Sequence, residues 1–77
     1  MKTDEYNGWK NYETWNVSLW INDDEGMYNF AKSYRRLGYK AFAEAMIEFG
    51  FKETLDGVSF TDSNLDFKAL DEMLSDL

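Results

Sequence analysis

Apolar residues recur at helical spacing along most of the chain. From Tyr12 to about Asn22 they cover so much of the circumference that the segment is predicted to be a central helix. Asn11 is predicted to be its N-cap, because an asparagine side chain accepts hydrogen bonds from first-turn amides. The face that we expect to be buried, with both tryptophans in the core, comprises Tyr12, Trp15, Val17, Leu19, Trp20 and Ile21.

Two shorter amphipathic segments follow. A helix is predicted over about residues 25–37, because apolar residues stand at i, i+3, i+4 and i+7, and the segment Asn22-Asp23-Asp24 offers carboxylates that could cap it. Another is predicted over about residues 39–49, and glycines 38 and 50 are expected to end the two helices. The expected buried positions are Met27, Phe30, Ala31 and Tyr34 in the first, and Phe42, Ala43, Met46, Ile47 and Phe49 in the second.

The carboxyl-terminal part has an irregular segment before a last helix. Asp56-Gly57 between apolar residues predicts a tight turn or a short hairpin. A helix over about residues 66–75, capped by Asn64 or Asp66, would direct its leucines inward. The sequence thus predicts a mainly α protein, a small compact bundle of about four helices. Residues 1–10 are predicted to be a flexible arm anchored by Trp9, and residues 11–77 a single helical domain.

The composition excludes several kinds of functional site. The 77 residues include no Cys and no His, so disulfides, thiolate sites and imidazole metal sites are excluded. The serines lack a histidine base, no phosphate-binding glycine loop is present, and we expect no enzyme activity and no catalytic or cofactor-binding residues. The segment 22–26 lacks the ligand spacing of a calcium loop, so no metal site is expected either. Asn16 lies beside apolar positions, where a buried amide must find hydrogen-bond partners.

Apolar runs of signal-peptide or membrane-span length are missing from the sequence. We therefore expect no membrane association and a location in the cytoplasm of the cell that makes the protein.

The charge is distributed unevenly. Residues 1–40 hold six acids and six bases, whereas residues 41–77 hold nine acids and two bases and so carry the whole net charge of −7. One interpretation is a solvated acidic surface. The sharper hypothesis is a surface that imitates nucleic-acid phosphates and docks on a basic partner. The residues predicted to form it are Glu44, Glu48, Asp66, Asp71, Glu72 and Asp76.

The block from Asn7 to Gly26, which contains Asn11-Tyr12-Glu13-Thr14-Trp15-Asn16-Val17, resembles the small "NYETWNV" family of uncharacterised proteins of phages, prophages and other mobile elements. The turn at Asp56-Gly57-Val58 and the short acidic helix after Leu65 are also similar to that family. The resemblance implies a phage accessory protein, a class that includes inhibitors of host restriction and CRISPR systems.

Three functions follow as hypotheses. The first is an accessory protein of anti-CRISPR or antirestriction type, which binds and inhibits a host defence protein with a basic, nucleic-acid-binding surface. The second is an adaptor that binds its partner through exposed aromatic residues. The third is a small nucleic-acid-binding regulator that uses a basic cluster, although the net charge of −7 opposes approach to a polyanion. The cluster comprises Lys32, Arg35, Arg36 and Lys40.

Overall fold

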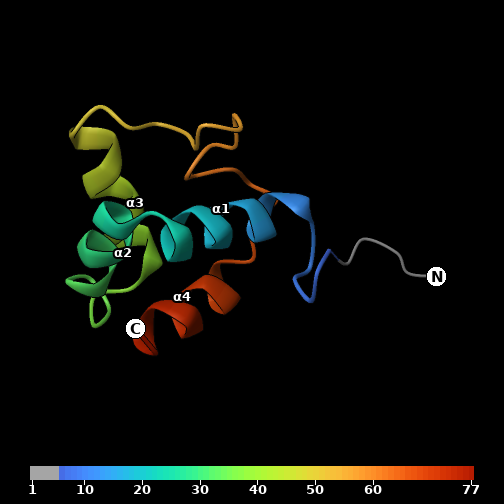
Figure 1. Cartoon of the computed structure of the whole chain (residues 1–77), viewed down its shortest axis with the longest axis horizontal. Coiled ribbons are helices and arrows are strands. Elements are labelled where there is room, and N and C mark those ends of the chain that lie inside the picture. Colours follow the sequence, from blue (N-terminus) through green and yellow to red (C-terminus); the bar gives the residue numbers. More distant parts are fainter. Residues whose placement is uncertain (1–5) are drawn as a thin grey trace.

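Four helices form the regular structure of residues 6–77, the part of the chain that the computed structural model describes (Figure 1). They are α1 (Tyr12–Asp23), α2 (Glu25–Lys32), α3 (Tyr39–Glu48) and α4 (Phe67–Ser75). Helix α1 packs against α2 and α4, and α3 packs against the same two helices. The described residues contain no strand beyond isolated bridges, so the prediction of a small, mainly α bundle is confirmed.

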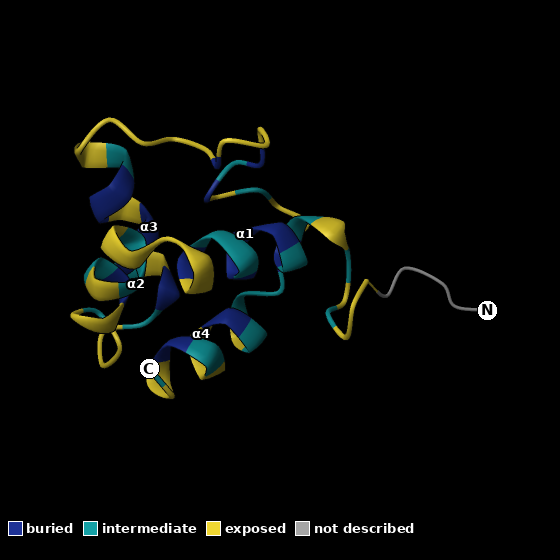
Figure 2. Ribbon diagram, in the orientation of Figure 1, coloured by how far each residue is buried: buried dark blue, intermediate teal, exposed yellow. Residues whose placement is uncertain are grey.

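The core is built from one face of each helix and from the segment before α4 (Figure 2). Tyr39, Phe42 and Phe60 are its largest fully buried side chains. Burial of apolar surface is the main favourable term in folding, and such rings supply much of it in a short chain. The other buried members of the core are Val17, Ile21, Ala31, Ala43, Met46, Val58, Leu65, Leu70 and Leu74.

Helix α1 buries only part of the predicted face, namely Val17 and Ile21. Thr14, Val17, Ser18 and Ile21 are buried, together with Asn16. Tyr12 is 40% exposed, and Trp15 and Trp20 are only half-buried. The prediction that both tryptophans belong to the core was therefore wrong. Small polar residues occupy the inner face because each finds a hydrogen-bond partner there, and the bulky rings cover the surface beside it.

The observed N-caps are among the residues that the sequence predicted, with one exception. The Asn11 side chain accepts from the Thr14 amide at 2.9 Å, and Asp66 accepts from the Ala69 amide at 3.1 Å. Asp24 accepts from the Met27 amide at 2.8 Å, which begins α2. Helix α2 ends at residue 32 rather than 37, and turns continue from there to Gly38, which precedes α3 as its N-cap. With no side chain, Gly38 cannot cap the helix itself.

Gly50 ends α3 as predicted, in a Schellman motif. Its φ is 97°, a left-handed conformation that glycine adopts readily. The Gly50 amide donates to the Ile47 carbonyl at 2.9 Å, and the Phe51 amide donates to the Met46 carbonyl at 2.9 Å. The chain therefore reverses sharply after α3, with Phe49 and Phe51 on either side of the glycine.

A tight turn interrupts the irregular segment before α4. Glu53 pairs with Ser59 in an isolated antiparallel bridge, and the Thr54 amide donates to the Val58 carbonyl at 2.8 Å. Inside it the Gly57 amide donates to the Thr54 carbonyl at 2.9 Å. This is the turn that the sequence predicted, without regular strands on either side.

The start of the described chain is folded onto the bundle. Tyr6 and Trp9 exchange backbone hydrogen bonds of 2.7 and 2.8 Å, and Trp9 packs against the core. The Tyr6 ring lies 4.7 Å from the Trp15 ring and 5.4 Å from the Tyr12 ring, measured between centroids. Residues 1–5 of the predicted arm lie outside the described residues.

Between residues 6 and 77, no helix has the combined length and apolar character that crossing a membrane requires.

Candidate functional site

The polar residues of the amino-terminal motif have structural partners. Asn16, which is fully buried, donates from Nδ2 to the Asp56 carboxylate at 2.8 Å and accepts at Oδ1 from the Thr54 hydroxyl at 2.7 Å. The Trp20 indole donates to the same carboxylate oxygen at 3.0 Å. These bonds join α1 to the turn at 53–59, and they lower the pKa of Asp56 below its usual value because they favour the ionised carboxylate. The expectation that Asn16 must find partners is confirmed.

Asn11 and Thr14 make a second connection from α1 to the carboxyl-terminal part. Asn11 Nδ2 donates to the Asn64 carbonyl at 2.6 Å. The Thr14 hydroxyl donates to Asn11 Oδ1 at 2.6 Å and accepts from the Asp66 amide at 2.9 Å. These groups are therefore occupied within the fold, which agrees with the interpretation of the motif as a capped structural helix.

Two of the six predicted acidic site residues cap helices. Asp66 is half-buried and caps α4. Asp71 is exposed, but its Oδ1 accepts from the Tyr39 amide at 2.6 Å and so caps α3, where Gly38 offers no side chain. The other four residues are exposed on α3, on α4 and at the C-cap of α4, and they are Glu44, Glu48, Glu72 and Asp76.

The acidic residues do not gather in one patch. The amino end of α3 lies against the middle of α4, where Asp71 contacts Tyr39. Glu48 is at the other end of α3, about 13 Å further along the helix axis at 1.5 Å per residue. Figure 1 shows that the carboxyl end of α3 points away from α4. Glu44 and Glu48 thus form one acidic region, and Glu72 and Asp76 form another.

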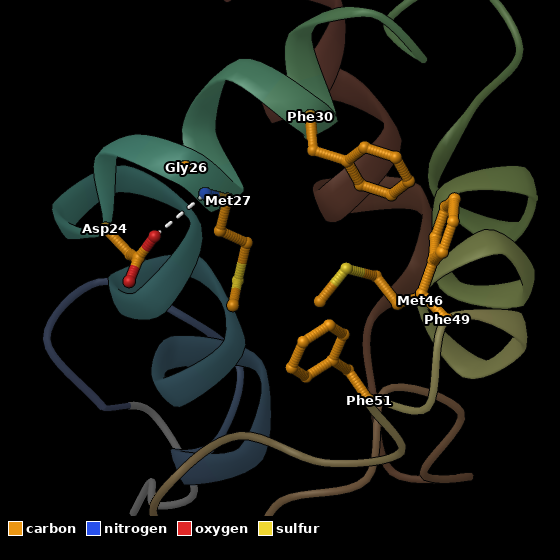
Figure 3. A pocket seen from close by; sticks show the side chains of 7 residues that line it. All are labelled: Asp24, Gly26, Met27, Phe30, Met46, Phe49 and Phe51. Atoms are coloured by element: carbon orange, nitrogen blue, oxygen red, sulfur yellow. Dashed lines mark hydrogen bonds between the residues drawn. The ribbon is translucent and has the colours of Figure 1, made fainter.

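An apolar groove opens between α2 and the end of α3. Phe49 is 68% exposed and Phe51 is 59% exposed, although both are large apolar residues. Figure 3 shows that the rings of Phe49 and Phe51 lie around the same hollow as the Phe30 ring and the side chains of Met27 and Met46. The hollow has a volume of about 460 Å³ and is lined by Asp24, Gly26, Met27, Phe30, Met46, Phe49 and Phe51.

The groove continues into a second hollow of about 190 Å³, which shares Asp24, Met27, Met46 and Phe51 with the first. The second hollow extends to Trp20 and to Leu55, which is 86% exposed. We call the two joined hollows the apolar groove. Figure 2 shows that the chain beside it, from the end of α3 to the turn at 53–59, is largely exposed.

Sequence reasoning missed this groove. Phe49 was assigned to the buried face of α3 with Phe42 and Met46, and that assignment was wrong. Gly50 was the signal in the sequence that Phe49 could be exposed. A glycine that ends a helix turns the chain away, so the residue just before it need not follow the buried face of the helix. Phe51 was assigned no role.

The structure brings together three of the four basic residues. Lys32, Arg35 and Arg36 line a shallow hollow of about 440 Å³ beside the end of α2. Arg35 also donates to the Leu77 carbonyl at 3.4 Å. Lys40 lies apart from them, with its Nζ 5.5 Å from the centre of the Phe67 ring.

The geometry of residues 6–77 provides neither a metal site nor a reactive buried ionisable group. No group of three or more acidic side chains in this part of the chain is arranged to hold a metal ion. The Tyr39 hydroxyl is buried and donates to the Phe60 carbonyl at 2.7 Å, and burial raises its pKa far above the usual value. Tyr39 is therefore a neutral structural residue.

The protein is a small four-helix bundle with an exposed apolar groove. The chain belongs to a family of unknown function, DUF7249, whose sequence model matches residues 2–77. No curated protein and no solved structure matches the chain.

Proposed function

We propose that the protein is a non-enzymatic binding module that holds a partner protein in the apolar groove. The observation that carries this proposal is the exposure of Phe49 and Phe51, two adjacent aromatic side chains that the core does not bury. Contiguous exposed apolar surface on a small protein marks interaction sites, and aromatic residues dominate the binding energy of such sites.

The fold itself has little need of two phenylalanines at these positions. Backbone hydrogen bonds at Gly50 and Phe51 make the reversal after α3, and they do not depend on the side chain at position 49. Phe51 lines the hollow together with Met46, and these two positions commonly form an apolar pair in this motif. The Phe49 ring meets the edge of the Phe30 ring, with centroids 5.6 Å apart, but this contact leaves 68% of the residue exposed.

Affinity capture with matched variants tests the proposal. Phe49→Asp should abolish the capture of specific proteins that the parent captures from a lysate of the cell in which it acts. Leu37→Asp is the control, because Leu37 is 70% exposed but lies outside the apolar groove. Purified partners must then bind the parent and the control directly. Equal capture by all three proteins would refute the groove as the binding surface.

A second candidate is inhibition of a host defence protein of the restriction or CRISPR type through the acidic surface. The net charge of −7 in residues 41–77 and the exposure of Glu44, Glu48, Glu72 and Asp76 favour it. An excess of negative charge speeds association with a positively charged protein. The test is phage plating on cells that restrict the phage, with and without expression of the protein.

In that assay the parent should restore plating, and amide substitution of the four exposed carboxylates should remove the effect. Asp66 and Asp71 must stay unchanged, because their carboxylates cap α4 and α3. Failure of the parent to restore plating, or full activity of the neutralised variant, would contradict this candidate.

A further inference from the structure

The lining of the apolar groove favours side chains of a protein over a small molecule. Ligand pockets orient their ligand with a few well-placed polar groups. In the first hollow the one charged lining residue is Asp24, and its carboxylate already accepts from the Met27 amide. Met27 and Met46 are unbranched and adapt to different apolar shapes, as methionines do in grooves that accept helices.

The backbone beside the groove does not form the regular edge that an added strand would need. The Phe51 amide donates to Met46, the Thr54 amide donates to Val58, and the Lys52 carbonyl accepts from Phe60. Strand addition needs a regular strand edge, and this segment contains only the isolated bridge between Glu53 and Ser59. An amphipathic helix needs no backbone partner, because its apolar face alone fills a groove.

The charges around the groove are almost all of one sign. The lining residues and their immediate neighbours in the sequence include six acids and one base, Lys52. The acids are Asp23, Asp24, Glu25, Glu48, Glu53 and Asp56. A partner that carries lysine or arginine beside its apolar face is therefore attracted, and an acidic one is repelled. A second copy of this chain is disfavoured, since both copies carry −7.

Building on the proposed function, we propose that the partner presents a cationic amphipathic helix, with its apolar face in the groove and basic residues over the acidic rim. The apolar contacts supply most of the affinity, and the rim selects the charge of the partner and raises the association rate.

Peptide selection tests the inference without knowledge of the natural partner. The probe is a displayed library of helical peptides of about four turns. Apolar residues are fixed at i, i+3, i+4 and i+7, and the remaining positions are random. Peptides selected on the parent and counter-selected on Phe49→Asp should carry a clear excess of lysine and arginine. Enrichment of neutral or acidic peptides would overturn the inference, as would the absence of any enrichment.

A selected cationic peptide then allows a charge test on the protein. Replacing Glu48 and Glu53 with Gln should weaken its binding about threefold to tenfold at low salt, and the difference should shrink as salt is added. Glu72→Gln combined with Asp76→Asn, at the end of α4, removes the same number of charges, is the matched control and should leave affinity unchanged. Equal losses in both variants would show a general charge effect and would overturn the role of the rim.

The two proposals fail in different ways. If peptides require Phe49 but have no charge preference, the cationic partner is refuted and the binding module stands. If cationic peptides bind Phe49→Asp as tightly as the parent, they bind elsewhere on the acidic surface, and both the inference and the groove are refuted. Concentration-dependent self-association that requires Phe49, seen in sedimentation, would make a second copy the occupant and overturn the inference.

Discussion

Asn16→Ala tests whether the hydrogen bonds between α1 and the turn at 53–59 stabilise the fold. The substitution leaves the buried Thr54 hydroxyl without its acceptor, and an unsatisfied buried group costs about 1–3 kcal/mol. The hole left by the amide adds about 1 kcal/mol. The better helix propensity of alanine offsets about half a kcal/mol. The exposed Asp56 carboxylate regains water, so its lost bond adds little.

The expected loss is about 1.5–3.5 kcal/mol in the free energy of unfolding. That is a large share of the roughly 4–11 kcal/mol that a domain of 77 residues holds. Urea unfolding followed by circular dichroism measures the loss, and tryptophan fluorescence provides a second probe. The slope against urea should stay unchanged, since the same surface is exposed on unfolding.

Two companion variants make the result specific. Asn29→Ala, at an exposed position of α2, should change stability by less than about 0.5 kcal/mol. Thr54→Val should destabilise alone but cost less when Asn16 is already alanine, with a coupling of about 0.5–3 kcal/mol. If Asn16→Ala behaves like Asn29→Ala, or if the two losses simply add, these hydrogen bonds do not hold the turn.

Three further predictions concern the core, pH and a glycine. Phe42→Ala removes a fully buried ring and should lower the free energy of unfolding by about 3–5 kcal/mol, measured by thermal or urea unfolding. Trp15→Ala, at a half-buried position, should lower it less. The reverse order would contradict the core as described. The folded pKa of Asp56 is lowered, so its stabilisation is present above the unfolded pKa of about 3.9 and is lost as pH falls through the folded pKa. The stability difference between the parent and Asp56→Ala should therefore shrink as pH falls below the unfolded pKa, and a difference that is constant with pH would exclude this linkage. Gly38→Ala should cost about 1–3 kcal/mol, because φ is 99° and a Cβ would lie 3.2 Å from the Asp71 carboxylate; an unchanged melting temperature would show that the helix start adapts freely.

The sequence predicted those features that depend on local chemistry. Asn11, Asp24 and Asp66 cap their helices because short polar side chains bond nearby amides, and this rule operates within a few residues. Gly50 was predictable as a helix end for a similar reason. The approximate helices and the turn at Asp56-Gly57 followed from the same kind of pattern.

Features that depend on distant parts of the chain were not predictable. Periodicity cannot tell which of two faces of α1 is inner, because that depends on Thr54, Asn64 and Asp66 meeting it in space. Asp71 looked like a solvent-facing charge until α3 was placed with an uncapped amide beside it. The apolar groove exists only because α2 stands opposite the end of α3, so no single segment could reveal it.

The bonds that secure α1 also set when the protein can fold. The partners of Asn11, Thr14 and Asn16 lie 38 to 53 residues later in the chain. During synthesis at about 5–20 residues per second, the first helix waits some 2–10 s before these partners have been made. Folding is therefore completed only when nearly the whole chain is available, as one cooperative event. Until then the apolar residues of the first two helices have no carboxyl-terminal segment to cover them, and the nascent chain is at its most prone to aggregation.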